Sequence, residues 1–247
     1  MIDPLIDSSS APVNVVGIDW ATQPRKVGLA LGLFCDKRLV LRDAMLGSGR
    51  NKSVDVIRGW IKGASQTLIC IDAPLGWPLP LRMALMSHSA GKPLRGDSYD
   101  LFMRATDRRV WRDLEKRPLE VGADRIARTA KSALDFLEEL AVGAGRSVEI
   151  AWHPARWDGI RAIEVYPAAT CAAWRINQKS IESVSQHCSF GNVNADVLQN
   201  PHVTDAILCA IAGSNFLCGL AAAPSAGIEK EKALQEGWIW APSKKSL

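Results

Sequence analysis

Four acidic residues stand where strands or helices of the chain are expected to end or to pack. Asp19 follows a run of β-branched residues, Asp72 follows a second apolar run, and Glu164 lies near the end of a third. Asp205 falls on the apolar face of a helical pattern, beside Leu208. A carboxylate that points toward a core is costly unless something pairs with it. Several carboxylates brought together repel one another, so the pattern predicts a site for a divalent cation such as Mg²⁺ or Mn²⁺.

Each acid also has a structural interpretation that the sequence leaves open. Asp19 can cap the turn after its strand, and Asp72 can form a turn with the proline two residues later. Asp205 can interact favourably with the dipole of its helix. Glu164 can form an ion pair with an arginine of the segment that precedes it. The four acids together favour a metal site more strongly than any one of them alone.

The elements that must position these acids form an α/β pattern. Residues 13–18, 26–34 and 38–46 predict three strands in an antiparallel meander. Residues 67–71 and 161–165 predict two further strands, each followed by or ending near one of the acids. The carboxyl ends of the first strand and of the strand at 67–71 therefore carry Asp19 and Asp72.

Helices are predicted between and after these strands. Ser53 is placed to cap a helix through Lys62, and residues 81–140 are mostly helical and charged. Asn200 and Pro201 supply the cap and first residue of a helix to about residue 219. Residues 238–240 predict a small edge strand.

This order of elements is the connectivity of an RNase H-like core. We therefore predict an α/β fold, an RNase H-like mixed sheet in which a three-strand antiparallel meander joins parallel strands, with flanking helices. Residues 1–12 predict a loose N-terminal leader, and residues 13–247 a single domain with a helical, basic insertion at about 74–158. Actin-like ATPases share the connectivity, so the fold alone does not choose the chemistry.

The composition excludes several classes of protein. Of the 247 residues, 47% are hydrophobic and 23% charged, which is typical of a soluble globular domain and unlike collagen-like or coiled-coil chains. The six cysteines include no C-x-x-C pair, which indicates reduced thiols and predicts a cytoplasmic protein. Residues 206–224 carry no charge but include glycines and polar residues, so they predict a buried helix rather than a membrane span.

The basic charge is confined to one part of the chain. Eleven Lys or Arg and seven Asp or Glu lie between residues 91 and 131, an excess that equals the net charge of +4 of the whole chain. Such a segment is often a solvated face, but it is also the charge pattern of a surface that contacts phosphates. Nucleic acid is therefore the predicted partner.

The chain resembles the domain-of-unknown-function family number 429, whose members are described as predicted RNase H-like nucleases. The resemblance extends in order from residue 15 to residue 242. It rests on Gly17-Ile18-Asp19-Trp20-Ala21, Ile71-Asp72-Ala73-Pro74-Leu75-Gly76-Trp77-Pro78, Arg104-Ala105-Thr106-Asp107-Arg108, Arg117-Pro118-Leu119, Ala123-Asp124-Arg125-Ile126-Ala127, Glu164-Val165-Tyr166-Pro167, His202-Val203-Thr204-Asp205-Ala206 and Glu236-Gly237-Trp238-Ile239.

The resemblance implies that Asp19, Asp72, Glu164 and Asp205 are the catalytic, metal-binding acids of a nuclease. Two Mg²⁺ or Mn²⁺ ions roughly 4 Å apart would then flank the scissile phosphate. This chemistry needs no covalent nucleophile, and the sequence has no obvious Ser/His/Asp or Cys/His set. His202, three residues before Asp205, either lines the site or packs as a structural histidine.

A second group of residues is predicted to bind the substrate. Arginine forks would hold a phosphate while neighbouring acids orient them, and Trp77 would stack on a base or lie buried. The structural alternative is that the same residues form ion pairs that fasten the insertion to the core. The predicted substrate-binding residues are Trp77, Arg104, Thr106, Asp107, Arg108, Asp124 and Arg125.

Two other functions are compatible with the fold. A non-catalytic protein that binds nucleic acid or nucleotides would keep the acids as a relic or as a structural cation site. An actin-like phosphotransferase would need glycine-rich turns around its nucleotide phosphates, but no glycine follows Asp19 until Gly28.

Overall fold

The computed structural model describes residues 11–47, 50–122, 124–155 and 157–243. Within these residues, six strands form one sheet in the order β3-β2-β1-β4-β6-β5. β1, β2 and β3 are antiparallel, whereas β4, β6 and β5 run parallel to β1. The predicted RNase H-like mixed sheet is therefore confirmed. The strands are β1 (Val13–Asp19), β2 (Gly28–Cys35), β3 (Arg38–Leu46), β4 (Gln66–Asp72), β5 (Val148–Ile150) and β6 (Gly159–Glu164).

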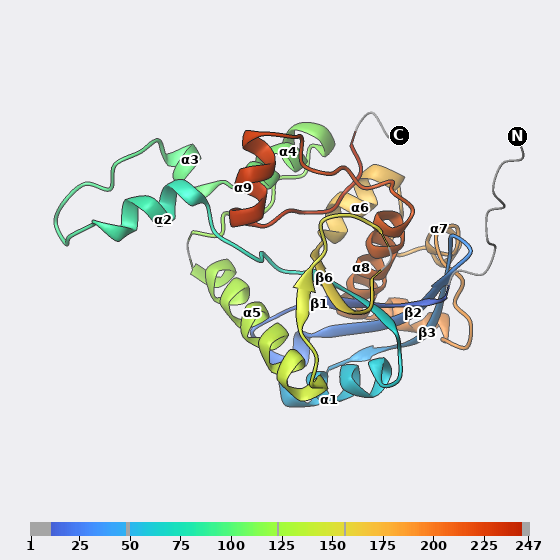
Figure 1. Cartoon of the computed structure of the whole chain (residues 1–247). Helices are drawn as coiled ribbons and strands as arrows, with labels where there is room; N and C mark the ends of the chain where they lie inside the picture. The colour runs from blue at the N-terminus through green and yellow to red at the C-terminus, as the bar shows by residue number, and fades with distance from the viewer. Residues whose placement is uncertain (1–10, 48–49, 123, 156, 244–247) are drawn as a thin grey trace, which may run out of the picture.

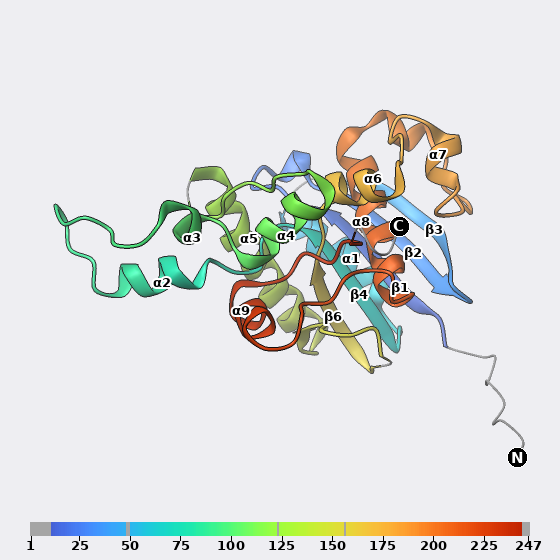
Figure 2. The ribbon, with the colours of Figure 1, turned by 90° about the horizontal axis from the view of Figure 1, so that it is seen from above.

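Helices cover both faces of the sheet (Figures 1 and 2). Val15 and Cys70 face a core built around α8, whereas Val16 and Ile71 face a core shared with α1 and α5. Alternate residues of a strand point to opposite faces, so β1 and β4 are apolar on both. The helices are α1 (Arg50–Ile61), α2 (Leu79–Met86), α3 (Ser98–Phe102), α4 (Ala105–Leu114), α5 (Asp124–Ala144), α6 (Pro167–Trp174), α7 (Ile181–Ser185), α8 (Pro201–Leu217) and α9 (Ile228–Glu236).

Two glycines let α8 lie directly on the sheet. A Cβ atom at Gly17 of β1 would collide with the backbone carbonyl oxygen of Ala206, and one at Gly28 of β2 would collide with that of His202. The first turns of α8 therefore contact the ends of β1 and β2 backbone to backbone. This contact determines where the side chains of those turns point.

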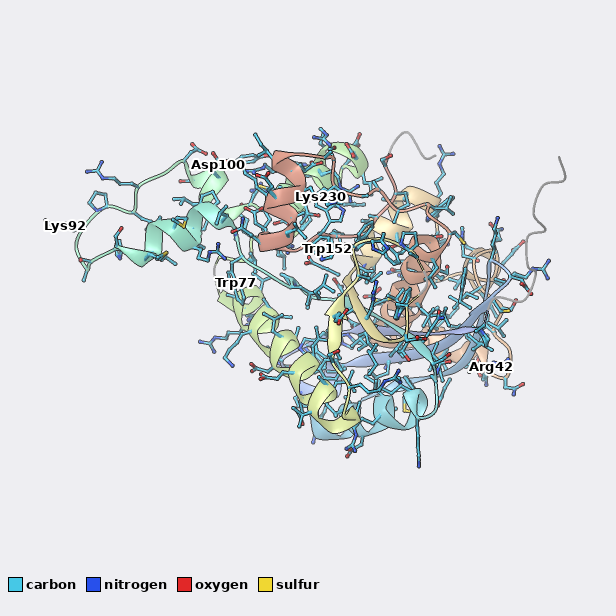
Figure 3. All side chains as sticks on the ribbon, viewed as in Figure 1. Arg42, Trp77, Lys92, Asp100, Trp152 and Lys230 are labelled. Carbon is cyan, nitrogen blue, oxygen red and sulfur yellow. The ribbon has the colours of Figure 1, made fainter. Side chains whose placement is uncertain are left out.

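The segment predicted as an insertion, residues 74–158, divides into two parts. α2 and α3 form an arm that extends away from the sheet in both ribbon views, with Lys92 at its far end and Trp77 near its base (Figures 1 to 3). α5, in contrast, belongs to the core, because Phe136 and Leu140 are fully buried against the sheet. The arm thus extends from the domain (Figure 1), whereas α5 is part of its core.

Several boundaries differ from the predicted ones. α1 begins at Arg50, so Ser53 is a buried residue within the helix and does not cap it. Residues 148–150 form β5, an edge strand too short to show a pattern in the sequence. In place of a strand at 238–240 there is a single bridge between Ile239 and Glu164. Most of the predicted 1–12 leader lies outside the described residues.

The uncharged stretch at 206–224 is helical only to Leu217, where α8 ends, and this part is mostly buried. Residues 218–224 lie beyond the helix and are partly or fully exposed, so the predicted buried helix is shorter than the stretch. Among the described residues, no helix is both long and apolar enough to cross a membrane.

Candidate metal and nucleic-acid site

Asp19 and Asp72 are neighbours across two strands. β1 and β4 are parallel, and their register pairs Asp19 with Asp72 as the last residue of each strand. Adjacent strands lie about 4.8 Å apart, and paired residues point to the same face of the sheet. The parallel pairing of two strands that both end in aspartate therefore brings two carboxylates to one edge.

Asp205 reaches the same edge from α8. Asn200 caps this helix by accepting hydrogen bonds from the backbone N–H of His202 and Val203, at 3.0 and 3.4 Å. Burial, followed by the charge of Asp19, raises the pKa of Asp205 to about 6. Burial, followed by the charges of Asp19 and Asp205, raises the pKa of Asp72 well above its usual range. The structure thus brings the predicted acids close together, because the pKa of Asp72 is raised, after burial, by the charges of Asp19, Asp205 and Glu164.

His202 contacts one of these acids directly. Its Nδ1 atom lies 2.7 Å from Oδ2 of Asp19, and an ionised Asp19 requires Nδ1–H to be the donor. Burial raises the pKa of Asp19, and the hydrogen bond and charge of His202 oppose this. His202 and Asp205 are three residues apart on one helix, so both face the end of β1. Of the two interpretations of His202, the structure supports the one in which it lines the site.

Glu164 has the structural role that the sequence left open. Its Oε1 and Oε2 atoms accept hydrogen bonds from Nη2 and Nη1 of Arg104, at 2.7 and 2.8 Å, in a pair whose side chains are 3% and 1% exposed. Oε2 also accepts from the backbone N–H of Leu75 at 3.0 Å. Both oxygens accept hydrogen bonds from protein donors, so in this structure Glu164 is part of a buried ion pair, and its expected metal-binding role stays a prediction.

Arg104 is likewise turned inward, contrary to the expected phosphate contact. Besides Glu164, its guanidinium donates to both carboxylate oxygens of Asp107, at 2.8 and 3.0 Å. Thr106 is also buried, and its Oγ1 accepts from the backbone N–H of Ile239 at 2.8 Å. These three residues fasten the start of α4 to β6 and to the C-terminal segment, which is the structural alternative considered above.

The other predicted substrate-binding residues are dispersed. Arg108 is partly exposed and forms an ion pair with Asp100 at 2.7 Å. Arg125 is exposed at the start of α5, and Trp77 is half-buried near the base of the arm (Figure 3). Asp124 is the first residue of α5, and its side chain lies outside the described ones. The structure does not bring these residues together with the three acids as one cluster.

A hollow between α4 and α9 gathers basic side chains instead. It has a volume of about 610 Å³, and its charged lining residues are Arg108, Arg109, Arg112, Lys232 and Glu229. Arg109 is buried and donates to the carbonyl oxygens of Ile239 and Ala241. Arg112 and Lys232 lie on different helices far apart in the sequence, which is why sequence patterns did not group them.

The three acids have the chemistry of a site for a hard divalent cation. Their ligand atoms are carboxylate oxygens, and among the described residues the carboxylates of Asp72 and Asp205 take part in no hydrogen bond or ion pair. As the side chains stand, no three His, Cys, Asp or Glu residues among those described are placed to hold a metal ion. A cation shared by all three acids therefore requires their side chains to turn toward it.

The fold and this edge define the class of protein: an RNase H-like α/β protein with carboxylates at the ends of its two central strands. The chain belongs to the family described as "Protein of unknown function (DUF429)", whose model matches residues 17–227. No curated protein is matched by the sequence. Among solved structures it is similar to "T. thermophilus RuvC in complex with Holliday junction substrate", with 11% identity, 84% of this chain and 96% of that chain covered, and a TM-score of 0.39.

Proposed function

We propose that this protein is a nuclease that hydrolyses phosphodiester bonds of nucleic acid with the help of a divalent metal ion. The observation that carries the proposal is the pairing of Asp19 with Asp72 at the ends of parallel strands, with Asp205 of α8 beside them. Burial, followed by the charge of Asp19, raises the pKa of both Asp72 and Asp205, and a cation stabilises such a concentration of negative charge.

Each residue of the site would have a distinct role. Asp19, Asp72 and Asp205 would hold Mg²⁺ or Mn²⁺, which when bound polarises a phosphoryl oxygen and makes a water molecule more acidic. The hydrogen bond from His202 would fix the orientation of Asp19, as second-shell partners of metal ligands do. Glu164, held by Arg104, would support the loop after Asp72 through the N–H of Leu75.

The basic hollow supports nucleic acid as the substrate. Two of its arginines form ion pairs with acids: Arg108 is partly exposed to solvent and Arg112 is largely exposed. Exposed ion pairs are weak, so a phosphate can replace the acidic partner of each arginine. Lys232 adds a third cation from α9. A phosphate backbone in contact with this hollow would be held by charge and not by base sequence.

One observation favours a second candidate, a nucleic-acid-binding protein without catalysis. No three metal-binding side chains of the described residues are already placed to hold an ion. Such a protein would bind nucleic acid, and a metal ion at most stoichiometrically, without cleaving the strand.

Cleavage of end-labelled single-stranded and double-stranded DNA and RNA distinguishes the two candidates. We expect cleavage that requires Mg²⁺ or Mn²⁺, is stopped by EDTA and is abolished by Asp19→Asn or Asp72→Asn. Asp55→Asn is the matched control, because its side chain is 70% exposed on α1. Binding without metal-dependent cleavage would favour the second candidate. Full cleavage activity in the Asp72→Asn protein would contradict the proposed site.

A further inference from the structure

A small cavity lies beside Asp72, between the end of β4 and the helices above it. Its volume is about 260 Å³, a little below the range of about 300–1,000 Å³ of pockets that enclose drug-sized ligands. We call it the Tyr166 pocket, and its main lining residues are Trp20, Asp72, Pro118, Leu119, Thr129 and Tyr166. A cavity of this size accepts one small group and not a whole oligonucleotide.

The charges of the lining exclude a phosphate from this cavity. Arg104 also borders it, but its guanidinium is already bonded to Glu164 and Asp107. Thr129 donates its hydroxyl to the carbonyl oxygen of Arg125 at 2.9 Å. Asp72 would repel an anion. The cavity therefore suits an uncharged group attached to a phosphate that lies outside it, next to a cation held by the acids.

The side chains that form the walls of the Tyr166 pocket are mainly aromatic or apolar. Trp20 is 5% exposed and is held by a hydrogen bond from Nε1 to Oγ of Ser132 (2.9 Å) and by ring contact with Phe136. Tyr166 is half-buried, at the N-terminus of α6. Leu119, from the connection between α4 and α5, is 71% exposed although it is a large hydrophobic residue. Rings and apolar faces of this kind bind nucleobases by stacking, largely without regard to sequence.

Tyr166 also offers a polar group. Its phenol hydroxyl is protonated at neutral pH and can donate a hydrogen bond to a group in the cavity. Flat apolar walls with one or two polar groups are typical of sites that orient a base.

We propose that the Tyr166 pocket binds the base of one unpaired nucleotide whose phosphate lies at Asp72. The inference rests on the proposed function for the position of that phosphate. A base within a duplex is stacked and paired, so it reaches such a cavity only from a single strand or after leaving the helix. The substrate class is therefore single-stranded nucleic acid, or duplex with an unpaired base.

Fluorescence anisotropy tests this without any need for cleavage. The probes are a labelled single strand, its fully paired duplex and a strand of abasic sites, each in Ca²⁺ and again in EDTA. We compare the wild type with Leu119→Ala and Tyr166→Ala, and use Leu85→Ala as the matched control, because Leu85 is a 54% exposed leucine on the arm. Leu119→Ala changes an exposed side chain and so leaves the fold intact, whereas the fold of Tyr166→Ala is checked by circular dichroism.

We expect both pocket variants to bind the single strand roughly fivefold to 100-fold more weakly than the wild type, the effect of losing a base stack. The same variants should bind the abasic strand and the duplex as the wild type does. An equal affinity of Leu119→Ala and Leu85→Ala for the single strand, or no single-strand binding by the wild type, overturns the proposal. Pocket-dependent binding without metal-dependent cleavage overturns the nuclease function alone, and cleavage with unchanged Leu119→Ala binding overturns the pocket alone.

Discussion

Asp19, the last residue of β1, is paired in register with Asp72, the last residue of β4. The pairing follows from the parallel direction of the two strands, and it concentrates negative charge at one edge of the sheet. Asp205 adds to this charge from α8, and His202 of the same helix donates a hydrogen bond to Asp19. The site therefore depends on the register of β1 against β4 and on the position of α8 on the sheet.

The pH dependence of stability should reveal the raised pKa of Asp205. The folded protein holds a proton on this carboxyl up to about pH 6, whereas an unfolded aspartate releases it near pH 4. The free energy of unfolding contributed by this group is therefore fully present below about pH 4 and falls as the pH rises through about 6. Urea denaturation without metal should show that Asp205→Asn gains stability relative to the wild type between pH 4 and pH 7. A difference between the two proteins that does not change with pH would contradict the raised pKa.

Removal of Arg104 should be strongly destabilising. Arg104→Met leaves the carboxylates of Glu164 and Asp107 buried without their cation, a type of change that costs about 3–5 kcal/mol. Arg112→Ala is the control, because its ion pair with Asp113 involves a side chain that is 69% exposed, and such pairs contribute about 0–1 kcal/mol. The measurement is the free energy of unfolding in urea. Similar values for the two variants would show that the buried network is not needed for stability.

The position of α8 on the sheet should be sensitive to a single methyl group added at Gly17. Gly17→Ala places a Cβ against the carbonyl oxygen of Ala206, and we expect a loss of about 1–3 kcal/mol or more as α8 moves away. At Gly59 of α1 nothing lies within 4 Å of an added Cβ, so Gly59→Ala should stabilise by about 0.5–1 kcal/mol. Thermal unfolding followed by circular dichroism compares the two. A melting temperature for Gly17→Ala equal to that of the wild type would mean that α8 is not held by this contact.

The basic hollow should carry part of the salt dependence of nucleic-acid binding. Lys232→Ala and Arg112→Ala should each weaken binding uniformly across sequences, and each lost phosphate contact lowers the slope of log affinity against log salt by about 1. Lys62→Ala is the control, because this residue lines a different hollow with Arg58 and Arg146. If the hollow variants and the wild type have the same slope, this surface does not contact the phosphates of nucleic acid.

The central strands and their acids could be predicted because their signals are local. A nearly unbroken β-branched run that ends in aspartate identifies β1, and an apolar run that ends in aspartate identifies β4, so the position of Asp19 and Asp72 follows from strand direction. The apolar face of α8 likewise identified Asp205 as a residue that points inward.

The pairing of Glu164 with Arg104 could not be predicted from local signals in the same way. The two residues are 60 positions apart, and an arginine next to an acid has the same pattern whether it faces solvent or is buried. The membership of α5 in the core was missed for a related reason, since an amphipathic helix within a charged segment is also typical of a surface insertion. Three residues of β5 are too few to form a periodic pattern.

The most direct test of the account is titration of Mn²⁺ into the metal-free protein by isothermal calorimetry. If Asp19, Asp72 and Asp205 hold the cation, the wild type binds Mn²⁺ at pH 7.5, and Asp19→Asn, Asp72→Asn and Asp205→Asn each bind it at least about tenfold more weakly while remaining folded. Asp55→Asn should bind as the wild type does. Wild-type affinity in all three site variants, or no Mn²⁺ binding by the wild type, would contradict a metal-dependent function at this edge of the sheet.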